Sequence, residues 1–216
     1  MMQNELPEIA PRAAHERLAA GASLLRAFAA RGAQALLDEL HELTARNPFR
    51  CMTTPGGFRM SVAMTNCGDA GWITDRTGYR YTALDPVTGG SWPPLPRVFR
   101  ELATTAAAAS GFNAFAPDAC LISRYEPGAR LSLHQDKDER DLESPIVSVS
   151  LGLPAAFLLG GHRRSEGARR IELEHGDVVV WGGPARLRYH GVLPLKEGWH
   201  PLLGGHRVNL SFRRAR

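Results

Sequence analysis

Cysteine is scarce in this chain, and no pair of cysteines has the spacing of a metal-binding or redox motif. The 216 residues include only Cys51, Cys67 and Cys120, and no CxxC sequence occurs. An odd count at wide spacing indicates neither a disulfide framework nor a structural zinc site. We therefore expect a protein of a reducing compartment, the cytoplasm.

Long apolar runs are absent as well. The first 21 residues, MMQNELPEIAPRAAHERLAAG, contain proline and glutamate early and no apolar core. We see no signal peptide or membrane span there or later in the sequence, and we expect no membrane partner.

A strong excess of one charge is the third missing feature. Lys and Arg number 26 and Asp and Glu number 22, which gives a formal net charge of +4. So small a basic excess is compatible with a polyanionic partner but does not indicate one.

The hydrophobic share of 44% and the charged share of 22% are those of a globular protein with a core. The length fits a single domain over residues 1–216.

Two segments of the first half predict helices, the segment between them predicts short strands and loops, and the second half predicts longer strands. Residues 24–46 and 95–110 have apolar residues at helical spacing, and Gly111 is a suitable helix stop. From residue 119 onward the period becomes two, in the segments CLISRY, PIVSVSLGL, RRIELEHGDVVVW, RLRYHGV and RVNLSFR. This pattern favours an antiparallel sandwich or jelly roll behind an α/β front.

The stretch SLHQDKDE, residues 132–139, contains a candidate half of a metal site. If it is extended, His134 and Asp136 point to the same face, because side chains alternate along a strand. A second histidine would complete the two-histidine, one-carboxylate triad of non-haem Fe(II) oxygenases. The alternative is a surface histidine beside solvated acids, which is the more frequent setting of an HxD sequence alone.

The remaining histidines differ in their suitability as the third ligand. His190 lies on a predicted strand, in RLRYHGV. Poorer or ambiguous candidates lie in predicted helices or in turns and loops: His15, His41, His162, His175, His200 and His206.

The last predicted strand, RVNLSFR, has one polar face. Arg207 and Arg213 are at its ends, roughly 20 Å apart along an extended chain, with Asn209 and Ser211 between them. Long arginine side chains that lean inward could hold the two ends of a short dicarboxylate, since guanidinium binds carboxylate in bidentate fashion. The alternative is a basic edge strand that faces solvent.

In combination, these motifs resemble the AlkB family of Fe(II)/2-oxoglutarate-dependent nucleic-acid dealkylases. The resemblance extends from about residue 18 to residue 214. It is carried by TPGGF with MSVAMTNCG, DACLISRYEPGARLSLHQDKDE, PIVSVSLGLPA, LEHGDVVVWGG, YHG and RVNLSFR. The order HxD, then H, then RxNxSxR is a specific combination.

The resemblance implies a mixed α/β, mainly β fold with a double-stranded β-helix (jelly-roll) core over residues 113–216. Residues 1–112 would supply N-terminal helices and a nucleotide-recognition lid. The implied metal is Fe(II), with 2-oxoglutarate and O₂ as cosubstrates. The implied iron ligands are His134, Asp136 and His190.

The resemblance also assigns the cosubstrate residues. Arg207 would pair with the distal carboxylate of 2-oxoglutarate, with Tyr125 beside it. Asn209 and Arg213 would lie nearer the metal-chelating end. Ser123 stands where the family pattern has asparagine, which puts the affinity for 2-oxoglutarate in doubt.

Further positions are implied to meet the substrate. Trp72 would stack on the target base. Other residues would line the pocket or its approach, with phenylalanine at 58 in place of the family's tyrosine: Phe58, Met60, Met64, Tyr79, Asp138, Arg164 and Trp181. Each has an ordinary alternative as core packing or solvated charge.

The implied activity is oxidative demethylation of 1-methyladenine and 3-methylcytosine in DNA, with RNA as a second candidate. The implied products are formaldehyde, succinate and CO₂, and the protein would act as a monomer on single-stranded or flipped bases. Two alternatives are a dioxygenase of a protein or small-molecule substrate and a catalytically silent jelly-roll binding module.

Overall fold

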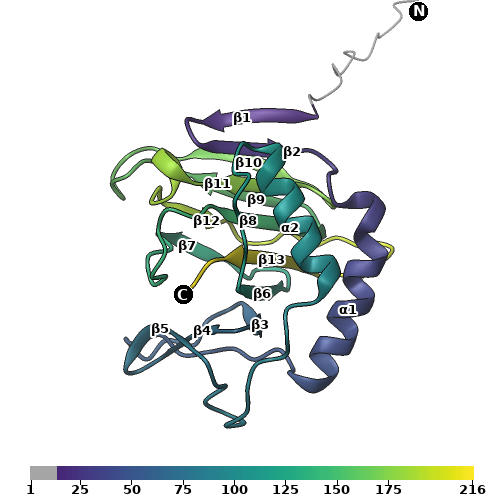
Figure 1. Cartoon of the computed structure of the whole chain (residues 1–216), viewed down its shortest axis with the longest axis vertical. Helices are drawn as coiled ribbons and strands as arrows, with labels where there is room; N and C mark the ends of the chain where they lie inside the picture. The colour runs from purple at the N-terminus through teal and green to yellow at the C-terminus, as the bar shows by residue number, and fades with distance from the viewer. Residues whose placement is uncertain (1–13) are drawn as a thin grey trace, which may run out of the picture.

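Two antiparallel sheets of unequal size face each other in the computed structural model, which describes residues 14–216 (Figure 1). The larger sheet has the order β1-β2-β11-β8-β13-β6-β3, and the smaller has the order β10-β9-β12-β7. β4 and β5 form a separate hairpin. This two-sheet, mainly β architecture confirms the predicted jelly roll.

The strand bounds are β1 (His15–Ala19), β2 (Ala22–Leu25), β3 (Ala63–Gly68), β4 (Gly71–Asp75), β5 (Gly78–Thr82), β6 (Ala119–Tyr125), β7 (Leu131–His134), β8 (Ile146–Gly152), β9 (Ala155–Leu159), β10 (Arg169–Leu173), β11 (Val178–Trp181), β12 (His190–Val192) and β13 (Arg207–Arg213). The helices are α1 (Ala33–Arg46) and α2 (Arg97–Ala109), with short 3-10 turns η1 (Ala30–Gly32) and η2 (Gly183–Ala185).

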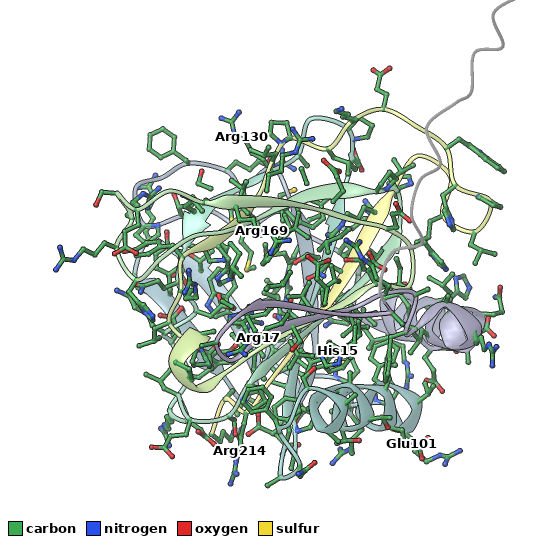
Figure 2. The ribbon with its side chains drawn as sticks, turned by 90° about the horizontal axis from the view of Figure 1, so that it is seen from above. His15, Arg17, Glu101, Arg130, Arg169 and Arg214 are labelled. Carbon is green, nitrogen blue, oxygen red and sulfur yellow. The ribbon has the colours of Figure 1, made fainter. Side chains whose placement is uncertain are left out.

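Both α-helices cover the outer face of the larger sheet (Figure 1). Figure 2 shows them nearly end-on and side by side, with Glu101 on the outer side of α2. Helix α2 buries Phe99 and three alanines, and these small side chains let its backbone lie close to β8 and β11. The helix stops before Gly111, whose φ of +90° favours glycine.

Strand β13 shows how the larger sheet separates its two faces. It lies between β8 and β6, and all seven of its residues are buried. Val208, Leu210 and Phe212 pack in the cluster under the helices. The alternate residues, Arg207 to Arg213, therefore point into the space between the two sheets. A row of polar side chains thus lies in the interior of the protein.

The helix prediction for residues 95–110 is confirmed, but the prediction for residues 24–46 is confirmed only from Ala33 onward. Ala22–Leu25 forms β2, which pairs with β11, and His15 begins β1 instead of lying in a helix. Leu24 packs between the sheets and Leu25 packs under the helices. A short strand that is buried on both faces is a continuous apolar run in the sequence. Periodicity alone does not distinguish such a run from a buried helix segment.

Strands from the N-terminal half belong to the same sheet as those from the C-terminal half. β2 pairs with β11 and β3 pairs with β6. The division at residue 112 and the single domain over 1–216 stay predictions. Within residues 14–216 neither helix has the length and apolar character to cross a membrane. Residues 1–13, where we expect no targeting segment, lie outside the described part.

Candidate active site

Two paired strands bring the candidate metal ligands together. His134 ends β7, His190 begins β12, and the two face each other in the register of the pair. Their ring centroids are 4.4 Å apart. With Asp136, two residues beyond β7, they offer ligand atoms that all lie within 4.8 Å of one another. No other group of this kind occurs among residues 14–216.

Backbone carbonyls fix the orientation of both imidazole rings. His134 Nδ1 lies 2.8 Å from the carbonyl of Ser132, and His190 Nδ1 lies 3.1 Å from the carbonyl of Arg188. A carbonyl only accepts, so each Nδ1 carries the proton and each Nε2 keeps its lone pair. The two Nε2 atoms lie 3.5 and 3.6 Å from the Asp136 carboxylate.

The charge states of Asp136 and His190 suit metal binding. Burial would raise the pKa of Asp136, but the nearby Arg213 and His190 hold that pKa well below its usual range. Burial, together with the neighbouring His134, lowers the pKa of His190. For His134, burial acts downward, but its contact with Asp136 outweighs burial and raises the pKa. Asp136 is therefore ionised, and His190 is neutral, at neutral pH.

Arg213 is bonded to the candidate metal ligand. Its Nε and Nη2 donate to Asp136 Oδ2 over 3.1 and 2.5 Å. The sequence reasoning placed Arg207 and Arg213 at the two ends of a dicarboxylate. Arg213 therefore also holds Asp136, and its contact with the cosubstrate stays a prediction.

Arg207 is differently placed. It is 1% exposed, its Nη2 donates to Ser150 Oγ over 3.0 Å, and its guanidinium lies 5.0 Å from the ring centroid of Tyr125. Within the described residues its Nε and Nη1 have no hydrogen-bond partner. Buried donors are normally paired, so this guanidinium fits a carboxylate of a bound ligand.

Neighbouring residues complete this end of the site. Burial raises the pKa of Tyr125 to about 12, so the hydroxyl stays protonated. Asn209 donates to Ser148 Oγ at 2.8 Å and to the Val149 carbonyl at 2.9 Å, which fixes its amide within the sheet. Ser123 faces Asn209 directly across β6 and β13.

A cavity of about 550 Å³ between the sheets joins these groups to the β4–β5 hairpin. Fifteen of the sixteen residues that we expect in the site line it: Met60, Met64, Trp72, Tyr79, Ser123, Tyr125, His134, Asp136, Asp138, Arg164, Trp181, His190, Arg207, Asn209 and Arg213.

Known proteins are similar to this protein over most of its length. The family model of the 2OG-Fe(II) oxygenase superfamily matches residues 21–213. The alpha-ketoglutarate-dependent dioxygenase AlkB of Salmonella typhimurium is 60% identical over 200 residues, which cover 93% of each chain. The chain belongs to the AlkB family. It is an Fe(II)/2-oxoglutarate-dependent dioxygenase.

Two further relatives of this AlkB-family protein agree with the assignment. The solved structure of OsALKBH1 matches with a TM-score of 0.82 and 31% identity, covering 93% of this chain and 99% of the other. The nucleic acid dioxygenase ALKBH1 of Homo sapiens is 34% identical over 131 residues, which are 59% of this chain and 33% of that protein.

The residues of the AlkB-family site fit the family's cofactor and cosubstrate. Two imidazoles and one carboxylate on one side of a metal leave coordination positions open for other ligands. The buried, unpartnered nitrogens of Arg207 lie in the same cavity and match a carboxylate. Fe(II) and 2-oxoglutarate are therefore accommodated by groups that are already in place.

The β4–β5 hairpin supplies an aromatic wall of the AlkB-family cavity. Trp72 and Tyr79 stack with their ring centroids 5.8 Å apart and their planes at 17°. The side-chain amide of Asn66 bonds both the backbone N–H and the carbonyl of Trp72 over 3.0 Å. The indole N–H donates to Asp138 over 2.8 Å. Trp72 is thus held at the backbone and at the ring.

Other expected substrate residues have different settings. Trp181 is buried, and its ring centroid lies 4.9 Å from that of His190. Phe58 is 77% exposed and is not part of the cavity lining, so only its expected place at the approach to the pocket stays a prediction. It follows a tight turn in which Gly57 has φ of +83°, and this turn leaves the ring in solvent.

Sequence reasoning missed three residues near the metal ligands: Tyr81, Glu139 and Arg186. Glu139 and Arg186 are buried and form an ion pair at 3.0 Å. Glu139 ends the run DKDE, which is typical of solvated charge, so the sequence gives no sign that it is buried.

Proposed function

We propose that this dioxygenase demethylates N-alkylated bases in nucleic acid, with 1-methyladenine and 3-methylcytosine in DNA as preferred substrates and RNA as a second candidate. The observation that carries the proposal is the aromatic wall of Trp72 and Tyr79 in the same cavity as the metal triad. A flat π-surface close to an oxidising metal suits a flat base that carries a methyl group.

The metal-site residues have distinct roles in this proposal. His134, Asp136 and His190 would hold Fe(II), with their two Nε2 atoms and one carboxylate as the ligand atoms on offer. The bound iron, with 2-oxoglutarate and O₂ as cosubstrates, supplies the oxidation of the N-methyl group, and the products are succinate, CO₂, formaldehyde and the restored base. Arg213 keeps Asp136 oriented and ionised through the bonds at 2.5 and 3.1 Å.

The cosubstrate residues bind and orient 2-oxoglutarate. Arg207 pairs with its distal carboxylate, and the protonated hydroxyl of Tyr125 lies beside that pair. Asn209 and Ser123 line the wall toward the metal. Burial of Arg207 and Tyr125 excludes water and strengthens the ion pair.

Substrate residues act on the base and on the backbone of the nucleic acid. Trp72 stacks on the base, Asp138 accepts from its exocyclic amine, and the side chains of Met60, Met64 and Trp181 enclose it. The cavity lining includes the cations Arg130, Lys137 and Arg164, which suit phosphates. Arg130 lies at the periphery of the molecule in Figure 2.

The substrate base is normally paired, so we propose a single strand or a flipped nucleotide as its form. The proposal places the protein in the cytoplasm as a monomer. The three cysteines are free, which suits a reducing compartment.

Release of succinate and formaldehyde tests the proposal. The purified protein is incubated with Fe(II), 2-oxoglutarate and O₂, with and without a single-stranded oligonucleotide that carries one 1-methyladenine. We expect the methylated strand to stimulate both products, and the same strand without the methyl group to stimulate neither. Succinate without any response to the oligonucleotide would indicate a protein or small-molecule substrate. Neither product under any condition would indicate a silent binding module.

A further inference from the structure

Two consecutive acidic residues hold two opposite residues of the β4–β5 hairpin. Trp72 and Tyr81 face each other in the register of the hairpin. Asp138 accepts from the Trp72 indole over 2.8 Å, and Glu139 accepts from the Tyr81 hydroxyl over 2.9 Å. Both acids follow closely after Asp136. One short segment therefore carries a metal ligand and both contacts to the hairpin.

Glu139 lies between two arginines in the interior. It is 6% exposed, and its Oε2 accepts from Arg186 Nη2 over 3.0 Å. Its Oε1, which also meets Tyr81, lies 3.1 Å from Arg213 Nε. A buried carboxylate is retained only with such partners. With Asp136 the group has two positive and two negative charges.

The same two arginines hold Asp136. Arg213 bonds its carboxylate, and Arg186 Nη1 donates to its backbone carbonyl over 2.6 Å. Glu139 thus fixes both groups that orient the metal carboxylate. Residues that hydrogen-bond to metal ligands commonly influence the metal affinity of a site, because they determine the direction and basicity of the ligand atoms.

We propose that Tyr81 and Glu139 are positioning residues that couple the hairpin bearing Trp72 to the metal ligand Asp136. The link runs from the Tyr81 hydroxyl through Glu139 and Arg213 to Asp136. It deepens the proposed function and rests on it only for the identity of the ligand that meets Trp72. Coupling between two sites is reciprocal. An ordered hairpin therefore raises the affinity for the metal by the same factor by which the bound metal favours the ordered hairpin.

Metal-dependent hydrogen exchange in the hairpin tests the link. The full chain is measured with and without Mn(II), which occupies the site without turnover, and exchange is followed over residues 71–82. In the natural protein we expect Mn(II) to slow this exchange. In Tyr81→Phe we expect exchange that no longer responds to Mn(II), and a Mn(II) affinity about 3- to 10-fold lower, the size of a typical net hydrogen-bond contribution.

A Tyr81 hydroxyl that stabilised the hairpin without a link to the metal site would give a different result. Its loss would speed exchange equally with and without Mn(II), and the difference between the two states would remain. Tyr81→Phe leaves all ion pairs of Glu139 in place, so the fold is not at risk. The inference is overturned if Tyr81→Phe keeps both the natural Mn(II) affinity and the metal-dependent protection.

A matched control and a double variant complete the test. Thr82→Val removes a hydroxyl from the next residue of β5, and this hydroxyl is buried with no partner among the described residues. We expect it to behave as the natural protein.

Glu139→Gln should lower the affinity for Mn(II) by about 10- to 100-fold, the range for residues that hydrogen-bond to metal ligands. Adding Tyr81→Phe to Glu139→Gln should weaken binding no further; an additive loss contradicts a shared link. Since no nucleic acid is used, these outcomes are independent of the proposed substrate.

Discussion

The indole N–H of Trp72 donates a hydrogen bond of 2.8 Å to Asp138, two residues beyond the metal ligand Asp136. The carboxylate that we expect to meet the base therefore also holds the ring that we expect to stack on it. A substitution at Asp138 changes two contacts at once, and a test of its role must separate them.

Charge selection by Asp138 is the first prediction. Methylation at adenine N1 or cytosine N3 leaves a cationic base, whereas methylation at thymine N3 leaves a neutral one. Asp138→Ala should lower kcat/KM for the cationic lesions more than for 3-methylthymine, by about 1–3 kcal/mol, the range of a good base contact. Competitive demethylation of oligonucleotides carrying each lesion measures this difference.

Asp138→Asn is the matched control, because its amide oxygen can still accept from Trp72 without carrying the charge. The selectivity for cationic bases should fall in Asp138→Asn while the stacking position of Trp72 is kept. An equal loss on cationic and neutral lesions in both variants would leave Asp138 with a purely structural role.

Loss of any metal ligand should abolish turnover. His134→Ala, Asp136→Ala and His190→Ala each remove one of three protein ligands. Zn²⁺ or Ni²⁺ should inhibit the natural protein by occupying the site without the redox chemistry. Formaldehyde release measures all of these effects. His41→Ala, on the exposed side of α1, is the matched control and should keep its activity; Fe(II)-dependent turnover in His190→Ala would assign the third ligand to another histidine.

Removal of Arg207 should weaken 2-oxoglutarate strongly. Arg207→Ala leaves a buried carboxylate without its cation, a loss of about 2–5 kcal/mol for a desolvated charge pair. Titration of 2-oxoglutarate in the turnover assay should show a raised KM, while Fe(II) binding is little changed. Arg169→Ala, on the exposed edge strand β10, controls for loss of surface charge. An unchanged KM in Arg207→Ala would remove this residue from the cosubstrate site.

Ser123→Asn tests the departure from the family pattern. The longer amide reaches farther into the cavity than the serine hydroxyl, so a direct bond to 2-oxoglutarate becomes available. We expect a lower KM for 2-oxoglutarate in this variant. A KM equal to that of the natural protein would show that Ser123 does not approach the cosubstrate.

The sequence predicted the parts of the site that depend on local alternation. An extended backbone from Ser132 is predicted to direct His134 and Asp136 to one face, and alternation along β13 directs Arg207 and Asn209 inward. Both features follow from a period of two. The placement of His190 opposite His134 depends on pairing of distant segments, and it was reached through the order of motifs in the family.

Features that depend on long-range partners were not predictable in this way. Glu139 resembles solvated charge until Arg186 and Arg213 are seen on either side of it. The strand at Ala22–Leu25 resembles the start of a helix until β11 is seen beside it. The family pattern places Phe58 in the pocket or at its approach, and the glycine turn before it leaves the ring outside the pocket.

The intact mass of a methylated oligonucleotide tests the central claim most directly. A single strand carrying one 1-methyladenine is incubated with the protein, Fe(II), 2-oxoglutarate and O₂, and its mass is measured by mass spectrometry. The account predicts a loss of one CH₂ unit per strand with the natural protein and no loss with His190→Ala. An unchanged mass with the natural protein, under conditions in which it converts 2-oxoglutarate to succinate, would contradict the account.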